Sequence, residues 1–233
     1  VGTDDCPNPI TVLTSGFGAA PNYYEYNGAY TSVWTVTDNA GHTASCSFTV
    51  VVEDPIPPVI TCPDDLTINT DPGECDAAVT YAHPLGGDNC PGFTFNLVQG
   101  PQSGAEFPLG TTIVEYQITD DMGNTTTCSF SVTVEDKEKP EISCPDDVTV
   151  LTNSDGTGNC AGLVPNFIPG VIASDNCTSP LTDFVQNPAA GTSIYGAHGQ
   201  QFDVVVTVTD DAGNSNACEL EITLMDNENP MLV

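Results

Sequence analysis

The sequence predicts an all-β protein made of tandem β-sandwich modules in a rod-like array, and three observations support this. A phrase of the form Thr-Asp-x-x-Gly occurs at residues 37–41, 119–123 and 209–213, each time followed by a cysteine-led segment. Self-similarity at a nearly fixed period indicates a repeat architecture. The segments between these phrases have the pattern of short strands bounded by Gly, Pro and Asp turns, and no helical period of useful length occurs. Short strands at this spacing are typical of a β-sandwich.

The repeat has a nearly constant length. Cys46, Cys128 and Cys218 follow the repeated phrase and lie 82 and 90 residues apart, and the phrase Cys-Pro-Asp-Asp at 62–65 returns at 144–147. A module of this size encloses only a small core, so cross-links should add to its stability. The expected divisions are a partial module at residues 1–54, modules at residues 55–136 and 137–226, and a linker with the start of a further module at residues 227–233.

The second module shows the expected elements in order. A split first strand is predicted at 59–62 and 66–69, a second at 76–81, and further strands at 93–98, 112–119 and 126–134. The Asp-x-x-Gly phrase predicts a tight hairpin between the last two strands, with Gly41, Gly123 and Gly213 supplying the positive φ of the turn. The linkers that follow the last strand are short and contain proline, so they should act as stiff spacers.

Taken together, these motifs resemble the hyalin repeat, or HYR, domain. The resemblance rests on Cys-Pro near the start, Asp-Asn-Cys at 88–90 and 175–177, Thr-Asp-x-x-Gly-Asn, a cysteine-led last strand and an acidic linker that ends at proline. It covers nearly the whole chain. It implies an immunoglobulin-like fold and an extracellular role, often adhesive or structural, and it supplies no catalytic residues.

The first module departs from this pattern. Its opening Asp4-Asp5-Cys6 aligns with residues 88–90, so the stretch equivalent to residues 59–87, with two expected strands, is absent. A sandwich without two strands exposes sheet edges and apolar core. We therefore expect strands from outside residues 1–233 to complete it, from the same polypeptide or a neighbouring subunit, which would give a head-to-tail fibre.

Composition points to an oxidising compartment and to cationic partners. Ten cysteines, most at repeating positions, suit the extracellular space or the cell surface. A formal charge of -30 repels nucleic acid and anionic membranes. No apolar run is long enough to span a bilayer, and no signal peptide is present. Because the chain begins with Val1, we expect a processed product or a part of something longer.

The cysteines are expected to form disulfides, with a redox-active role as the alternative. In a sandwich, the segment that enters the third strand and the residue after the last hairpin lie at the same pole. This favours three pairs: Cys6–Cys46, Cys90–Cys128 and Cys177–Cys218. By elimination, the other pairs are Cys62–Cys75 and Cys144–Cys160. This second pairing stays open, because a straight first strand carries its two ends to opposite poles and four cysteines allow three connectivities.

Acidic residues gather at that same pole and predict a calcium site, because Ca²⁺ takes six to eight oxygen ligands in irregular geometry. The candidate ligands are Glu53, Asp54, Asp88, Asp120, Asp121, Glu135, Asp136, Asp175, Asp210 and Asp211. The alternative is a solvated acidic loop in which Asp and Asn only form turns. Lys137 and Lys139 lie in the second linker and could substitute for an ion there.

Nothing in the sequence indicates an enzyme. His42, His83 and His198 lie in unrelated positions without a repeated nucleophile beside them, and so acidic a chain singles out no glycosidase pair. Trp34 aligns with Tyr116 and with Val206, which indicates a core position.

The function expected is that of a structural segment of an extracellular fibre or a cell-surface adhesin. Its partners would be copies of itself or adjoining modules, with possible glycans on the sequon residues Asn124 and Asn176. The alternative is a module that binds carbohydrate or another ligand. The candidate aromatic cluster for that role is Tyr23, Tyr24, Tyr26 and Tyr30.

Overall fold

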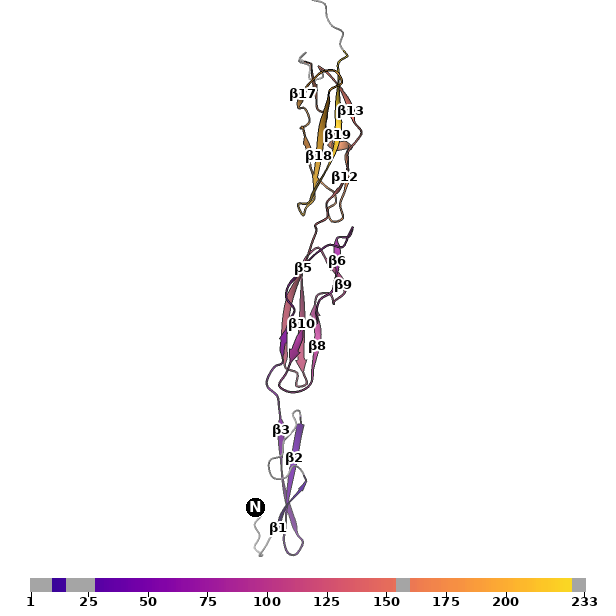
Figure 1. Ribbon diagram of the computed structural model, residues 1–233. Helices are drawn as coiled ribbons and strands as arrows, with labels where there is room; N and C mark the ends of the chain where they lie inside the picture. The colour runs from indigo at the N-terminus through magenta and orange to yellow at the C-terminus, as the bar shows by residue number, and fades with distance from the viewer. Residues whose placement is uncertain (1–9, 16–27, 154–159, 228–233) are drawn as a thin grey trace, which may run out of the picture. The chain divides into compact units, whose positions relative to one another are not determined.

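The computed structural model describes residues 10–15, 28–153 and 160–227, and these form β-strands joined by turns (Figure 1). The helical element among them is a short 3-10 turn, η1 (Ile168–Gly170). No helix in the described residues is long and apolar enough to cross a membrane. The all-β prediction is therefore confirmed.

Contacts group the chain into two compact units. The first comprises residues 1–64, 81–102 and 113–130, and the second comprises residues 65–80, 103–112 and 131–233. The division passes through the second sequence repeat, whose two longest strands belong partly to each unit. The module boundaries at residues 54, 136 and 226 stay predictions.

The first repeat forms one antiparallel sheet in the order β1-β2-β3. The strands are β1 (Ile10–Ser15), β2 (Gly28–Thr37) and β3 (Thr43–Val52). The hairpin between β2 and β3 runs in continuous register from Thr37 opposite Thr43 to Gly28 opposite Val52. Gly41 in its turn has a φ of 92°, as the Asp-x-x-Gly phrase predicts.

The second repeat has a four-stranded sheet in the order β5-β11-β10-β8 and two small sheets, β4-β7 and β6-β9. Its strands are β4 (Val59–Thr61), β5 (Leu66–Asn69), β6 (Asp76–Val79), β7 (Leu85–Gly87), β8 (Phe93–Gln99), β9 (Ala105–Pro108), β10 (Gly110–Asp120) and β11 (Thr125–Glu135). β5 runs parallel to β11, whereas β8 runs antiparallel to β10.

The third repeat has the same layout. Its large sheet has the order β13-β19-β18-β16, and its small sheets are β12-β15 and β14-β17. The strands are β12 (Glu141–Ser143), β13 (Val148–Leu151), β14 (Ala161–Leu163), β15 (Ile172–Ser174), β16 (Asp183–Asn187), β17 (Ser193–Tyr195), β18 (Gln201–Thr209) and β19 (Ser215–Met225). By the same order, β1, β2 and β3 correspond to β8, β10 and β11 of the second repeat.

The six predicted strand segments of the second repeat are confirmed as β4, β5, β6, β8, β10 and β11. The sequence reading missed β7 and β9. The first is three residues long with two glycines, and the second is four residues long and ends at Pro108, so neither shows a measurable alternation. Both strands form because a partner elsewhere in the chain pairs with them.

Alternating apolar residues of the last strand supply the core. Phe130, Val132 and Val134 on β11 are buried, as are their equivalents Leu220, Ile222 and Leu224 on β19. Burying one such side chain stabilises the fold by roughly 1.5–3 kcal/mol. In the first repeat, the equivalent Phe48 on β3 is 53% exposed. All three repeats thus have the alternating apolar residues on the last strand. Among the described residues, these side chains are buried in the second and third repeats, and Phe48 of the first repeat is not.

The predicted disulfide pairing is wrong. The structure pairs Cys62 with Cys128 and Cys144 with Cys218, with Cα–Cα distances of 5.7 and 5.6 Å, so Cys90–Cys128, Cys177–Cys218, Cys62–Cys75 and Cys144–Cys160 do not form. The reason is that the first strand changes sheets: β4 pairs with β7, and β5 then pairs with β11. The crossing segment carries Cys62 to β11. The predicted pair Cys6–Cys46 lies partly outside the described residues.

The third disulfide joins different repeats. Cys75, between β5 and β6, bonds to Cys177 of the Asp-Asn-Cys loop, with the Cα atoms 4.9 Å apart. The sequence reading considered pairs within one module only and therefore could not find it. Cys90 and Cys160, the corresponding residues of the other repeats, form no disulfide within the described residues.

Candidate metal centres

Each repeated hairpin is built around one aspartate. Asp120 ends β10, and its Oδ1 accepts hydrogen bonds from Met122 N at 2.9 Å and Asn124 N at 2.8 Å. Its Oδ2 accepts from the Asn124 side-chain amide at 2.8 Å. Asp210 accepts from Asn214 in the same way, from N at 2.7 Å and from Nδ2 at 2.8 Å. The Asp and Asn of the repeated phrase thus form the turn, as the alternative reading proposed.

The same asparagines also hold the linkers. Asn124 Nδ2 donates to the carbonyl of Asp54 at 2.8 Å, and Asn214 Nδ2 donates to the carbonyl of Asp136 at 3.3 Å. Asp54 and Asp136 are the residues at which the chain leaves β3 and β11, and they are 7% and 4% exposed. The hairpin therefore places a linker carboxylate beside its own aspartate.

A third carboxylate comes from the Asp-Asn-Cys loop that follows β7 or β15. Asp88 Oδ2 accepts from Cys90 N at 3.2 Å. Asp175 Oδ2 accepts from Cys177 N at 3.0 Å and from Thr178 N at 2.7 Å. In both loops Oδ1 of the aspartate is buried and accepts no hydrogen bond.

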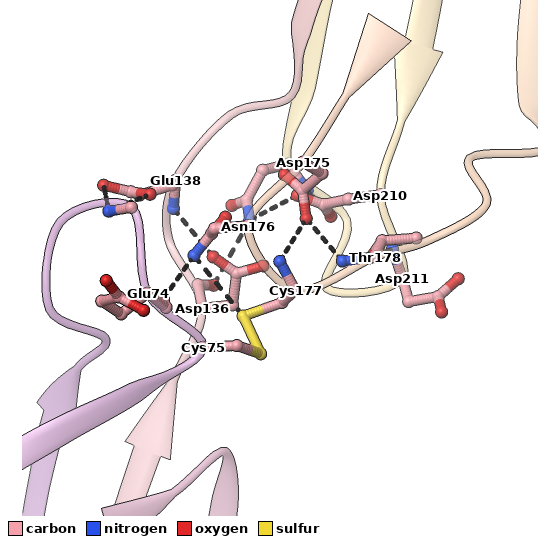
Figure 2. The surroundings of a disulfide bond; sticks show 12 residues. Glu74, Cys75, Asp136, Glu138, Asp175, Asn176, Cys177, Thr178, Asp210 and Asp211 are labelled. Carbon is pink, nitrogen blue, oxygen red and sulfur yellow. Dashed lines mark hydrogen bonds between the residues drawn. A yellow bond between two sulfur atoms is a disulfide. The ribbon is translucent and has the colours of Figure 1, made fainter. Parts of the chain in front are cut away.

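Two equivalent clusters of three carboxylates result. Oxygen atoms of Asp54, Asp88 and Asp120 lie within 4.8 Å of one another, and so do those of Asp136, Asp175 and Asp210 (Figure 2 shows the second cluster). Three carboxylate oxygens in them are buried and accept no hydrogen bond: Asp88 Oδ1, Asp136 Oδ2 and Asp175 Oδ1. A buried carboxylate oxygen without a donor is costly, so these atoms call for a cation. Oxygen-only donors suit Ca²⁺.

The two clusters differ in their electrostatics. Burial, followed by repulsion from Asp175 and Asp210, raises the pKa of Asp136. In the first cluster, hydrogen bonds from the Cys90 thiol, Ile56 N and Asn89 lower the pKa of Asp54. The same thiol contact, together with burial, raises the pKa of Cys90 to about 11. The second cluster therefore has the greater need for a positive charge.

The equivalent asparagines of the two Asp-Asn-Cys loops make different hydrogen bonds. Its equivalent Asn89 donates to both carboxylate oxygens of Asp54, at 3.2 and 3.1 Å. Asn176 Nδ2 instead donates to the carbonyl of Glu74 at 2.8 Å, beside the Cys75–Cys177 bond (Figure 2). In the second cluster Asp136 Oδ2 accepts no hydrogen bond.

A second polar contact accompanies that disulfide. Gly73 N points between the two carboxylate oxygens of Glu138, at 3.1 and 3.0 Å. The linker glutamate thus contacts the β5–β6 loop of the second repeat. The sequence does not predict Glu138 or Asn214 as functional residues, and it predicts Asn176 only as a glycosylation site, although the repeated Asp-Asn-Cys and Gly-Asn phrases carry the signal for the two asparagines.

Four predicted ligands lie outside the clusters that the described residues form. Glu53, Asp121 and Asp211 are exposed and belong to neither cluster. Glu135 is half-buried, and its Oε2 lies 3.1 Å from Lys137 Nζ. Lys137 therefore pairs with Glu135 and does not replace an ion beside Asp136.

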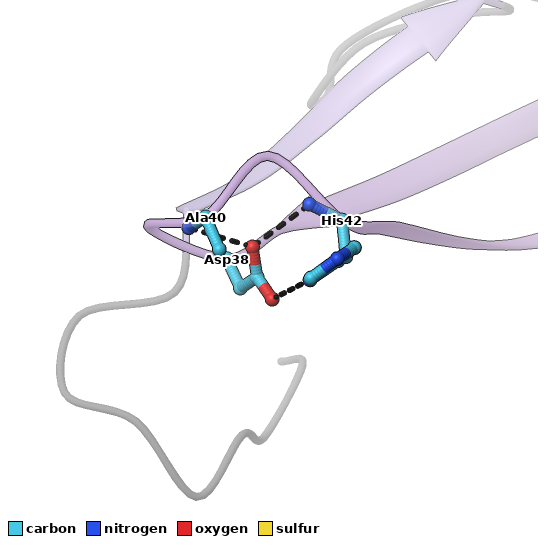
Figure 3. Close-up of polar contacts among 3 residues, drawn as sticks. All are labelled: Asp38, Ala40 and His42. Atoms are coloured by element: carbon cyan, nitrogen blue, oxygen red, sulfur yellow. Dashed lines mark hydrogen bonds and ion pairs between the residues drawn. The ribbon is translucent and has the colours of Figure 1, made fainter.

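The histidines do not form a common site. In the first repeat, His42 takes the place of the hairpin asparagine, with its Nδ1 2.9 Å from Asp38 Oδ2 (Figure 3). His83 packs edge-on against Phe95, and His198 Nδ1 accepts from Asp226 N at 3.2 Å. Of the aromatic cluster considered for ligand binding, Tyr23, Tyr24 and Tyr26 lie outside the described residues.

Glycosylation at Asn124 conflicts with its hydrogen bonds. Both hydrogens of its amide are used, by Asp54 O and Asp120 Oδ2, and a glycan replaces one of them. We expect the folded chain, secreted from glycosylating cells, to carry no glycan at Asn124. Mass spectrometry after enzymatic deglycosylation in heavy-oxygen water checks this, because released sites become labelled Asp. A labelled residue 124 in the folded fraction would contradict the expectation. Asn176 Nδ2 makes one strong bond, so the argument does not extend to it.

Comparison with known proteins identifies one domain. Residues 53–134 match the HYR domain model. This HYR domain contains the first carboxylate cluster complete, from Asp54 through Asp88 to Asp120.

The matched relatives include two sea urchin hyalins. The chain is 32% identical to the hyalin of Lytechinus variegatus over 202 residues, which is 84% of this chain and 36% of that protein. It is 27% identical to the hyalin of Strongylocentrotus purpuratus over 205 residues, 84% of this chain and 16% of that one. A rat protein named for sushi, von Willebrand factor type A, EGF and pentraxin domains is 28% identical over 76% of this chain and 5% of its own length. The chain thus spans a minor part of these relatives.

Among solved structures, Drosophila N-cadherin EC1-3 aligns with 96% of this chain and 91% of that chain, with a TM-score of 0.39 and 13% identity. The disulfides and the relatives together make this an extracellular or cell-surface protein.

Proposed function

We propose that the chain is a structural segment of an extracellular fibre or a cell-surface adhesin, built from tandem HYR-like modules in a rod-like array that assembles head to tail. The second and third repeats have the same strand order, and each has its own cluster of three carboxylates, which supports two modules of the same kind. The similarity to hyalin covers 84% of the chain, more than the single matched domain at residues 53–134.

The observation that carries this proposal is that the hairpin of each module is hydrogen-bonded to the linker that precedes the module. In both clusters the hairpin asparagine donates to the linker carbonyl, at 2.8 and 3.3 Å. A linker tied by side chains loses the freedom of a tether, so its two ends keep a fixed direction. That property suits a scaffold, whose partners are adjoining modules.

We also propose that Ca²⁺ binds both clusters and stiffens the linkers. The support is the set of three buried carboxylate oxygens without donors: Asp88 Oδ1 and Asp175 Oδ1, which are equivalent in the two clusters, and Asp136 Oδ2 in the second cluster. An ion there would be shared by the hairpin, the Asp-Asn-Cys loop and the linker, so it would join three segments of the chain. The remaining ligands would be carbonyls and water, as is usual for Ca²⁺.

A chelation experiment tests this role. Addition of calcium to the chelated chain should raise the melting temperature and slow hydrogen exchange at Cys90 N and Cys177 N, since both amides donate to cluster aspartates. The second cluster should respond more strongly, because Asp136 Oδ2 lacks a donor while Asp54 has Asn89. Magnesium at the same concentration is the control. Identical melting and exchange in calcium and in chelator would refute the calcium proposal.

A further inference from the structure

The sheet of the first repeat has an open apolar face in unit 1. Trp34, Val36 and Phe48 line a hollow together with Cys46. Phe48 is 53% exposed, whereas the equivalent Phe130 and Leu220 are 4% and 3% exposed. A contiguous apolar face of this kind marks a surface that another segment covers.

The second and third repeats show which segment occupies the equivalent place beside the sheet. In the third repeat, β13 lies parallel to β19, with Val148 opposite Ile222, and the second repeat has β5 beside β11 with Leu66 opposite Val132. Within the described residues, β3 pairs with β2 alone, so its other edge has unpaired backbone groups where a parallel strand lies in the other repeats. In the second repeat that strand and its neighbours β4, β6 and β7 all come from residues 59–87.

Two unbridged cysteines of unit 1 point to the same segment. Cys46 corresponds to Cys128, which bonds to Cys62. Cys90 corresponds to Cys177, which bonds to Cys75. Neither Cys46 nor Cys90 forms a disulfide within the described residues. Both partner types, the Cys-Pro cysteine and the β5–β6 loop cysteine, lie within one stretch of residues 59–87, so a single segment can supply both.

We propose that the open face of the first repeat binds the leading segment of an HYR-like module, equivalent to residues 59–87, and that this segment forms two disulfides, from its Cys-Pro cysteine to Cys46 and from its β5–β6 loop cysteine to Cys90. The segment adds a strand parallel to β3. The inference rests on the proposed tandem assembly and names the occupant and its covalent bonds.

Each bond forms by thiol–disulfide exchange with a small-molecule disulfide such as oxidised glutathione. One protein thiol attacks the oxidant as thiolate and releases one glutathione thiol, and the second protein thiol displaces the other. The net step joins two protein sulfurs and reduces one glutathione disulfide to two thiols. Cys46 is exposed, whereas Cys90 is partly buried, so we expect the bond to Cys46 to form first.

The test uses the purified chain with its three disulfides intact and a synthetic peptide of residues 59–87 in a glutathione redox buffer. The expected product is a one-to-one adduct in which the peptide's Cys62 is bonded to Cys46 and the peptide's Cys75 to Cys90. Mass spectrometry of a non-reduced digest with an isotope-labelled peptide identifies these bonds. The emission of Trp34, the chain's one tryptophan, should shift to shorter wavelength as the hollow closes.

Four controls decide the outcome. A peptide with Cys62→Ser should keep only the bond to Cys90, and one with Cys75→Ser only the bond to Cys46. Cys160 is exposed and unbridged, but its equivalent Cys75 bonds to an Asp-Asn-Cys loop cysteine, so it should stay unmodified. Crossed pairs, equal reaction at Cys160, or the same bonds with a scrambled peptide of equal cysteine spacing would overturn the inference.

A peptide with both cysteines replaced by serine separates this inference from the proposed function. If it shifts Trp34 emission while the native peptide forms crossed bonds, completion of the module stands and the covalent assignment fails. If it shifts nothing and forms no complex, the open face does not take this segment, and head-to-tail completion fails with it.

Discussion

Replacing Asp136 with Asn is expected to have opposite effects in chelator and in calcium. In chelator, the change removes a buried carboxylate that lacks a donor on Oδ2 and is repelled by Asp175 and Asp210, so the melting temperature should rise. Removal of one buried polar group without a hydrogen-bond partner should stabilise the folded state by about 1–3 kcal/mol. In calcium, the same change removes a ligand and should abolish most of the stabilisation by the ion. Thermal melts of both proteins in both buffers give the four values needed.

Asp211→Asn is the matched control, because it makes the same change of charge on an exposed residue beside the cluster. It should leave both melts nearly unchanged. A uniform loss of stability for Asp136→Asn in both buffers would mean that the carboxylate is needed for folding and not for an ion.

The pH dependence in chelator follows from the same group. The folded-state pKa of Asp136 lies above its ordinary value, so its contribution to stability is greatest at low pH, where the carboxyl is protonated, and is lost as pH rises through the folded-state pKa. Asp54 has a lowered pKa and contributes in the opposite sense, with stability that is lost as pH falls. In chelator, this contribution of Asp136 should raise the melting temperature toward acid pH, and Asp136→Asn should remove that rise. Thermal melts over the pH range in which carboxyl groups titrate measure the effect.

Replacing Cys144 with Ser should destabilise the third repeat by about 4 kcal/mol, because its bond to Cys218 closes a loop with a sequence separation of 74 residues. The bond also ties β12 to β19, whose Leu220 and Ile222 belong to the core. Hydrogen exchange of the amides on β18 and β19 measures the loss where it occurs and separates it from unfolding of the other repeats.

Cys160→Ser provides the comparison, since that thiol is exposed and unbridged. Exchange on β18 and β19 should then stay close to that of the unchanged chain. Equal loss in the two variants would show that the Cys144–Cys218 bond adds little, and that the core alone determines the stability of this repeat.

The sequence was most informative where local chemistry decides the structure. Asp120 and Gly123 determine the hairpin within five residues, so the repeated phrase was sufficient to place β10 and β11. The six cluster aspartates were foreseen for the same reason, since each follows or ends a strand at an equivalent position. Asp121 and Asp211 are exposed and lie outside the two clusters, so the position next to a cluster aspartate is not equivalent to it.

What the sequence could not give depends on pairing over long distances. The first strand crosses from one sheet to another, because β4 pairs with β7 and β5 pairs with β11. This crossing places Cys62 near β11, and no local sequence pattern predicts it. The bond between Cys75 and Cys177 links residues 102 positions apart in different repeats. The amide of Asn176 donates to the carbonyl of Glu74, which is also 102 positions away in the sequence.

The overlapping disulfides limit how far the chain can be stretched. A pull between residues 62 and 218 passes through Cys62–Cys128, along the chain to Cys144, and through Cys144–Cys218. Only the segment from 128 to 144 can then lengthen, and a fully extended segment of that size reaches roughly 55 Å. The bond between Cys75 and Cys177 closes a longer route through residues 62–75 and 144–177, which stays slack while the shorter route is intact. Tension on these repeats would therefore be carried by covalent bonds even after their sheets had come apart, and reduction of the disulfides would let the whole stretch from residue 62 to residue 218 extend.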